Sequence, residues 1–331
     1  MGKLLEVRGL KTEFETGEGT VKAVDGITYD VDEGETVAIV GESGSGKSVG
    51  ALSILGLIPN PPGKIIAGEI IFAGQDLLKL DDAGIRRVRG GEIGMVFQEP
   101  MTSLNPVLTI GLQLTETMLV HLSMSQHEAD QRAVELLGLV GIGEPERRLR
   151  QFPHHLSGGM RQRVMIALAL SCKPKLIIAD EPTTALDVTI QAQILELMKE
   201  LNRTMNVAQI IITHNLGVVA RYADRVNVMY AGKIVEMGNA GQIYHRPRHP
   251  YTVGLLKSVP RMDQPRGQRL IPIEGQPPDL SRLDQGCSYR PRCQWMIDEC
   301  ASHYPPLEDS GDAQLSACWR RSELDELREA S

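Results

Sequence analysis

The stretch Gly41-Glu-Ser-Gly-Ser-Gly-Lys-Ser48 directly follows the apolar run Thr36-Val-Ala-Ile-Val40. This is the G-x-x-x-x-G-K-[ST] spacing of a phosphate loop, placed where a buried strand would end. Backbone N–H groups of such a loop surround phosphate oxygens, and the following helix directs its positive dipole end at the same anion. Lys47 can supply charge to the outer phosphates, and Ser48 can bind magnesium. The sequence therefore predicts a nucleotide site; the alternative is a Gly/Ser-rich turn that happens to contain lysine.

The composition limits the possible classes of protein. The 331 residues suggest about two domains, and 42% hydrophobic but only 4% aromatic content is typical of an aliphatic α/β core. The net charge of −7 provides no overall attraction for nucleic acid, so such a role would need local patches, as at residues 86–89 and 147–150. The N-terminus carries charges where a signal peptide is apolar, and no apolar stretch approaches about 18 residues. We therefore expect a soluble, cytoplasmic protein.

The hydrophobic pattern predicts an α/β fold. Short apolar runs at residues 37–40, 93–97, 176–179 and 210–213 indicate buried strands of a mainly parallel sheet. Helical periodicity lies between them, at residues 162–170 and 190–202. Residues 4–31 alternate like antiparallel strands, whereas residues 100–153 carry only helical patterns. After about Gly241 the chain becomes rich in Pro, Arg and His, so we expect a separate C-terminal module there.

Two further motifs fit ATP chemistry. The run Leu176-Ile-Ile-Ala-Asp180-Glu181 ends a strand with two carboxylates, of which Asp180 can hold magnesium through water and Glu181 can polarise an attacking water. Helix capping is the alternative for this pair. The run Leu156-Ser-Gly-Gly-Met160 begins a helix with Ser157 as its cap, which makes a second phosphate-binding helix terminus. One phosphate loop cannot use both termini, so the pattern suggests a partner chain.

With the run from Asp180 to Asp187, these motifs make residues 1–240 resemble an ATP-binding-cassette (ABC) ATPase. The resemblance implies a P-loop NTPase fold with a RecA-like core, an antiparallel β subdomain and a helical subdomain at about residues 100–156. A C-terminal, cysteine-containing extension would follow at residues 241–331. The resemblance also implies that two subunits hold two nucleotides between them, each providing its phosphate loop to one site and its Ser-Gly-Gly helix to the other.

The resemblance assigns roles to single residues. Glu181 would be catalytic, together with Gln98, which senses magnesium and water, and His214, which contacts the γ-phosphate. Asp187 would communicate across the dimer. Phe14 would stack on adenine, although a strand-core role is an equal alternative. The remaining implied sets are Gly41, Ser43, Gly44, Ser45, Gly46, Lys47, Ser48, Val49 and Asp180 for ATP, Ser48, Gln98 and Asp180 for Mg²⁺, and Ser157, Gly158 and Gly159 for the nucleotide of the partner subunit.

Two departures from the family pattern are small. Met160 stands where many relatives have Gln, and Asn215 follows the histidine where Asp is common. Neither removes a catalytic group.

The segments Gln98-Glu-Pro-Met-Thr-Ser-Leu-Asn-Pro106 and Arg248-His-Pro-Tyr-Thr252 are similar to the dipeptide/oligopeptide importer ATPases and their nickel-importing relatives. The resemblance implies an ATPase that energises peptide uptake at the cytoplasmic face of the inner membrane. Its partners would be a second homologous ATPase, two membrane-spanning subunits and an external substrate-binding protein. The alternatives are an importer of nickel or another small solute and, more distantly, a soluble ATPase that acts on nucleic acid through basic residues at 86–89 and 147–163; we expect no nucleic-acid partner.

Four cysteines, Cys287, Cys293, Cys300 and Cys318, have five, six and 17 residues between them. Disulfides are disfavoured in the cytoplasm, and four thiolates suit zinc or an iron–sulfur cluster. The tight cysteine pairs of most zinc sites are missing, and unligated thiols remain a third alternative. The similarity to the C-terminal cysteine motif of peptide-importer ATPases implies a [4Fe–4S] cluster with a structural or regulatory role. The fifth cysteine, Cys172, lies in an apolar helical pattern and is expected in the core.

Overall fold

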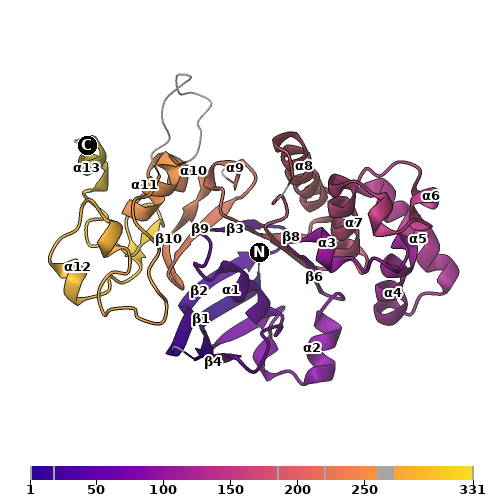
Figure 1. The fold of residues 1–331 in the computed structure, drawn as a ribbon, viewed down its shortest axis with the longest axis horizontal. Coiled ribbons are helices and arrows are strands. Elements are labelled where there is room, and N and C mark those ends of the chain that lie inside the picture. Colours follow the sequence, from indigo (N-terminus) through magenta and orange to yellow (C-terminus); the bar gives the residue numbers. More distant parts are fainter. Residues whose placement is uncertain (1, 18, 185, 220, 259–271, 330–331) are drawn as a thin grey trace. The chain divides into compact units, whose positions relative to one another are not determined.

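A computed structural model describes residues 2–17, 19–184, 186–219, 221–258 and 272–329 (Figure 1). The chain divides into two compact units, each built from segments that are distant in sequence. The first, which we call the helical unit, contains residues 1–3, 31–36 and 79–212. The second, the phosphate-loop unit, contains residues 4–30, 37–78 and 213–331.

The helical unit contains three strands in the order β8-β7-β6, and both neighbouring pairs are parallel. Every residue of β7 and β8 is buried, which is why these strands are almost continuously apolar. The sequence predicts all three strands to within a few residues. Their bounds are β6 (Ile93–Val96), β7 (Leu176–Asp180) and β8 (Ala208–Thr213).

Helices occupy the chain between β6 and β7, as the helical periodicity predicts (Figure 1, magenta). One of them, α5, begins at a capping box in which the Glu128 carboxylate accepts a hydrogen bond from the Ser125 N–H at 2.8 Å. The helices of this unit are α2 (Asp82–Val88), α3 (Pro100–Ser103), α4 (Ile110–Leu122), α5 (Gln126–Leu139), α6 (Pro145–Leu149), η2 (Pro153–His155), α7 (Gly158–Leu170) and α8 (Val188–Met205).

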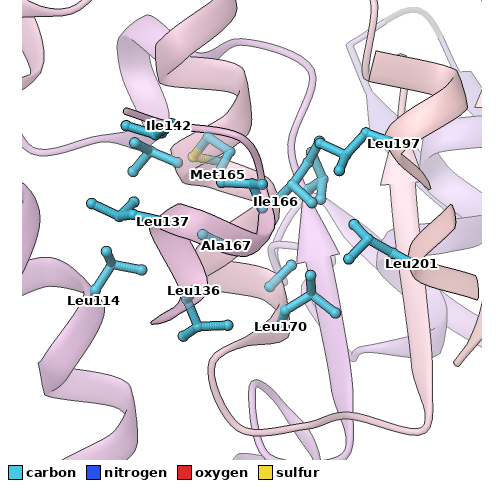
Figure 2. Close-up of a cluster of buried hydrophobic side chains, with 14 of the residues drawn as sticks. Leu114, Leu136, Leu137, Ile142, Met165, Ile166, Ala167, Leu170, Leu197 and Leu201 are labelled. Atoms are coloured by element: carbon cyan, nitrogen blue, oxygen red, sulfur yellow. The ribbon is translucent and has the colours of Figure 1, made fainter. Parts of the chain in front are cut away.

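The core of the helical unit lies where α4, α5, α7 and α8 meet the strands (Figure 2). Figure 2 shows Leu114 of α4, Leu136 of α5 and Ile166 of α7 in one cluster, and all three side chains are almost completely buried. Cys172 is also buried, at 4% exposure, and its thiol donates to the Thr117 carbonyl at 3.5 Å. This confirms the expectation that Cys172 is a core residue.

The phosphate-loop unit contains an antiparallel sheet in the order β2-β1-β4-β5 and a second set of strands in the order β11-β12-β10-β9-β3. The first sheet matches the alternating pattern of residues 4–31. In the second set, β3 and β9 are parallel, whereas β10 is antiparallel to β9 and β12. The strands are β1 (Lys3–Thr16), β2 (Gly19–Asp32), β3 (Thr36–Val40), β4 (Gly63–Phe72), β5 (Gln75–Asp76), β9 (Arg225–Tyr230), β10 (Lys233–Asn239), β11 (Glu308–Asp309) and β12 (Leu315–Ser316).

The C-terminal region shares its core with the strands of the phosphate-loop unit. Tyr251, Leu255 and Tyr289 pack in one cluster with Val40 and Val228. The change in composition after Gly241 predicts a separate module, and the apolar residues of this cluster pack against β3 and β9. The helices of the unit are α1 (Lys47–Ile54), η1 (Leu77–Lys79), α9 (Leu216–Val219), α10 (Ala240–His245), α11 (Pro250–Lys257), η3 (Arg290–Arg292), α12 (Glu299–Ser302) and α13 (Leu324–Glu329).

Among the described residues, no helix is both long enough and apolar enough to cross a bilayer.

We expect Leu114→Ala to lower the free energy of unfolding of the helical unit by about 2–5 kcal/mol, because it opens a cavity in a fully packed core. Leu112→Ala is the matched control: the same substitution in the same helix, at a side chain that is 50% exposed, should cost less than about 1 kcal/mol. Urea unfolding followed by circular dichroism measures both. Equal losses for the two variants would contradict this account of the core.

Candidate functional site

The phosphate loop links β3 to α1 and closes around the side chain of Lys47. This side chain is 5% exposed, and its Nζ donates to the carbonyls of Gly41 and Glu42, each at 2.8 Å. A third contact, to Ser45 Oγ, measures 3.4 Å. The ammonium group is therefore held inside the loop by backbone oxygens, next to the helix N-terminus where an anion would bind.

Glycine is required at two positions of the loop. A Cβ at Gly41 would overlap the Met229 carbonyl, and a Cβ at Gly46 would overlap the Ala23 carbonyl. Gly46 also has a φ of 101°, which residues with a side chain rarely adopt. It caps α1 through this backbone geometry rather than with a side chain.

The other predicted loop residues occupy different surroundings. Ser43 and Gly44 are exposed, Ser45 is buried, and Ser48 and Val49 lie half-buried in the first turn of α1. Figure 1 shows α1 beside the strands of the phosphate-loop unit. These positions leave the exposed part of the loop open to a ligand.

Phe14 and His214 also belong to the phosphate-loop unit. Phe14 lies on β1 opposite Gly63 of β4, and its ring occupies the space beside the Gly63 Cα. It is half-buried, which suits strand packing as well as stacking on a base. His214 follows β8 and is exposed, and the next residue, Asn215, donates its N–H to Thr213 Oγ1 at 3.1 Å. Their roles toward a nucleotide remain predictions.

In the helical unit, Gln98 and Glu181 lie in direct contact at the ends of β6 and β7. Gln98 Nε2 donates to Glu181 Oε2 at 3.2 Å, and the Thr184 hydroxyl donates to the same oxygen at 2.7 Å. Glu181 has a φ of 45°, an uncommon backbone conformation for a residue with a side chain. Asp180, the last residue of β7, is 6% exposed. The strand end therefore holds two carboxylates beside an amide donor, a set that can orient magnesium and a water molecule.

Ser157 and Asp187 each begin a helix of the helical unit. Ser157 Oγ accepts from the Met160 N–H at 3.3 Å, and Asp187 Oδ1 accepts from the Ile190 N–H at 3.0 Å. Gly158 and Gly159 follow Ser157; Gly158 is exposed and Gly159 is half-buried. Capping by Ser157 confirms the predicted helix start, whereas contact with a partner's nucleotide remains a prediction.

The motif Arg248-His-Pro-Tyr-Thr252 attaches the C-terminal region to β10. The Glu236 carboxylate, fully buried on β10, accepts from the backbone N–H groups of Arg248 at 2.5 Å and His249 at 3.0 Å. Gln314 Nε2 donates to it at 2.7 Å. Burial raises the pKa of Glu236 to about 7, although these donors lower it.

The cysteines of the C-terminal region face one small cavity of about 20 Å³. Its lining includes all four predicted residues, Cys287, Cys293, Cys300 and Cys318. Burial raises the pKa of Cys293 to about 11 and that of Cys318 to about 12, so both are protonated at neutral pH unless a cation binds. Over the described residues, however, no group of three or more His, Cys, Asp or Glu side chains is spaced to hold a metal ion. The structure thus gathers the thiols but does not by itself support an iron–sulfur cluster.

The sequence motifs do not predict one ion pair of the phosphate loop. Arg292 forms a bidentate ion pair with Glu42, a variable position of the loop motif, at 2.6 and 3.0 Å. No sequence signal relates two residues that lie 250 positions apart. Only the position of Arg292 within the cysteine motif could have drawn attention to it.

Comparisons with known proteins agree with these features. Residues 24–184 match the ABC transporter family, and residues 235–300 match the C-terminal region of oligopeptide/dipeptide transporters. The dipeptide transport ATP-binding protein DppD of Bacillus subtilis is 52% identical over 96% of this chain and 95% of its own length. The oligopeptide transport ATP-binding protein OppD of the same organism is 53% identical over 96% of this chain and 88% of its own.

Solved structures show the same fold. A dimeric post-hydrolysis state of the ATP-binding cassette MJ0796, bound to ADP and Pi, is 31% identical with a TM-score of 0.64 and covers 71% of this chain and 98% of its own. The structure of cbiO1 from Clostridium perfringens is 30% identical with the same TM-score and covers 74% of this chain and 92% of its own. The predicted fold class is thereby confirmed.

The chain therefore belongs to the ABC transporter ATPases. Within this class, its C-terminal region and its most similar reported relatives place it in the oligopeptide/dipeptide transporter family.

We expect Gly46→Ala to abolish nucleotide binding, because the added Cβ would displace the backbone of the loop. Gly44→Ala is the matched control: Gly44 also has a positive φ, of 78°, but a Cβ there meets nothing within 4 Å. Titration with a fluorescent ATP analogue compares the two variants. If both substitutions weaken ATP binding equally, the positive φ, rather than the close packing at Gly46, is what ATP binding requires.

Proposed function

We propose that this chain is the ATP-hydrolysing subunit of a membrane importer for dipeptides or oligopeptides. The observation that carries this proposal is the 52% identity to a dipeptide transport ATP-binding protein across 96% of the chain. The match of residues 235–300 to the C-terminal region of these transporters supports it independently of the ATPase motifs.

The proposed roles follow from the chemistry of each group. Lys47 and the loop N–H groups bind the phosphates, while Ser48, Gln98 and Asp180 hold Mg²⁺. Glu181 polarises the attacking water, and its contacts with Gln98 and Thr184 orient its carboxylate. The further roles proposed are adenine stacking by Phe14, γ-phosphate contact by His214, contact with the partner's nucleotide by Ser157, Gly158 and Gly159, and communication across the dimer by Asp187.

The proposed partners are a second homologous ATPase, two membrane-spanning subunits and an external binding protein, with this chain at the cytoplasmic face of the membrane. Exposed apolar side chains support a docking role for the segment from Gln98 to Pro106. Phe97 is 39%, Met101 66% and Val107 74% exposed, on and beside the short helix α3. Exposed apolar side chains within and next to this segment suit contact with a protein partner.

Part of the basic segment on which the nucleic-acid alternative rests makes contacts within the helical unit. Arg147 pairs with Glu144 at 2.8 Å, and Arg161 and Arg163 donate to the carbonyls of Pro153 and Val140 at 2.8 and 2.6 Å. Arg161 and Arg163 are therefore held by backbone carbonyls of the helical unit. Nothing in the comparisons reported above favours nickel over peptides as cargo.

We expect Glu181→Gln to reduce ATP hydrolysis by the reconstituted importer at least about 100-fold while ATP binding is retained, because the amide cannot polarise water as a carboxylate does. Phosphate release and nucleotide binding, measured on the same preparation, separate the two effects. Glu196→Gln, at an exposed carboxylate of α8, is the control and should hydrolyse ATP normally. Near-normal turnover of Glu181→Gln would refute its assignment.

We further propose that Cys287, Cys293, Cys300 and Cys318 hold a [4Fe–4S] cluster. The support is the residue type: all four thiols line one cavity, and thiolates are the ligands that a cluster or zinc prefers. A bound cluster would cross-link a segment that has little core of its own.

Anaerobically purified protein should contain about four iron and four sulfide ions per chain, and Cys293→Ser should lose them whereas Cys172→Ser should not. Metal analysis and visible absorption provide the readout. One zinc ion per chain, or no metal in the wild-type chain, would overturn the cluster.

A further inference from the structure

Glu42 of the phosphate loop is contacted by the C-terminal region through both its backbone and its side chain. Its N–H donates to the Tyr251 hydroxyl at 2.7 Å, and its carboxylate accepts two hydrogen bonds from Arg292, at 2.6 and 3.0 Å. Its carbonyl accepts from Lys47 Nζ at 2.8 Å. One loop residue therefore connects the phosphate-binding lysine with two residues of the C-terminal region, all within the phosphate-loop unit.

Arg292 is held rigidly for this contact. Its side chain is only 3% exposed, and Nε and Nη2 also donate to the carbonyls of Glu274 at 3.0 Å and Ile273 at 3.3 Å. Nη1 lies 3.4 Å from the Tyr230 hydroxyl. With the two bonds to Glu42, these contacts occupy the planar fork of donors that makes arginine suited to bidentate pairing with a carboxylate.

The charge of this pair matters for a neighbouring nucleotide. An unpaired carboxylate in the loop would repel the polyanionic phosphates, and Glu42 is only 27% exposed, so water screens it incompletely. The Arg292 guanidinium is positively charged at neutral pH, and two of its nitrogens contact the Glu42 carboxylate. The guanidinium thus neutralises the loop carboxylate.

We propose that Arg292 is a positioning residue for the nucleotide site: it neutralises Glu42 and, together with Tyr251, holds the phosphate loop in its binding conformation. The C-terminal region, in which Arg292 directly precedes Cys293, thereby sets the nucleotide affinity of the loop. This inference rests on the proposed function, since it requires ATP to bind at this loop. An ion pair with a purely structural role would attach the C-terminal region to the phosphate loop without changing the affinity of the loop for the nucleotide.

The test measures Kd for MgATP and the thermal midpoint of the full-length chain, and KM and kcat for ATP in the reconstituted importer. We expect Arg292→Gln to raise Kd and KM about tenfold with kcat within about twofold, because it leaves an uncompensated carboxylate in the loop. Glu42→Gln should bind within about threefold of the wild type, because the Gln side-chain oxygen can still accept from Arg292 and no uncompensated carboxylate remains beside the phosphates. The double variant Arg292→Gln/Glu42→Gln should return to that range, since no charge is then left unpaired.

Arg290→Gln is the matched control. Arg290 lies in the same short helix η3. Its guanidinium pairs with Asp284 at 2.7 Å and donates to the Ala301 carbonyl at 3.1 Å, and both partners lie outside the loop. It should leave Kd unchanged.

Distinct results would overturn the inference: an unchanged Kd in Arg292→Gln, an equal loss in Arg290→Gln, or a double variant that binds as weakly as Arg292→Gln. If Arg292→Gln does not fold, the double variant is compared with the wild type, and a Kd raised about tenfold would overturn the inference. A wild-type chain that fails to bind MgATP would instead contradict the proposed function.

Discussion

The close approach of backbone atoms at Gly41 and Gly46 is the constraint on which the nucleotide site depends. A side chain at either position would overlap a carbonyl of a neighbouring strand, so the loop could not close around Lys47. Closure buries the lysine side chain against the carbonyls of Gly41 and Glu42. Everything proposed for ATP binding, including the influence of Arg292, requires this loop conformation.

In the helical unit, a different constraint positions the carboxylates of Asp180 and Glu181. Its packed core, from Leu114 to Leu201, fixes the parallel strands whose ends carry Gln98 and Asp180. At the end of β7 the backbone adopts the positive φ of Glu181, and the carboxylate is held by an amide and a hydroxyl donor. Strain of this kind persists only where the surrounding structure maintains it, which is common at catalytic positions.

The C-terminal region is attached by buried polar groups as well as apolar packing. Glu236 and Glu42 are both satisfied by donors from this region, the first by backbone N–H groups and the second by Arg292. Buried carboxylates without such partners would be strongly unfavourable. This dependence explains why a region with few apolar residues is ordered against β3, β9 and β10, and why its contacts reach the phosphate loop.

Local sequence by itself determined β1, β2, β3, β6, β7 and β8, the longer helices between β6 and β8, the phosphate loop and the cap at Ser157, because each depends on residues within a few positions of one another. It also indicated the family, since several motifs occur in order. Only the tertiary structure decided that the C-terminal region shares a core with β3 and β9, that four distant thiols face one cavity, and that Arg292 pairs with Glu42. These contacts join segments far apart in the chain, and periodicity and spacing carry no information about which distant side chains will meet.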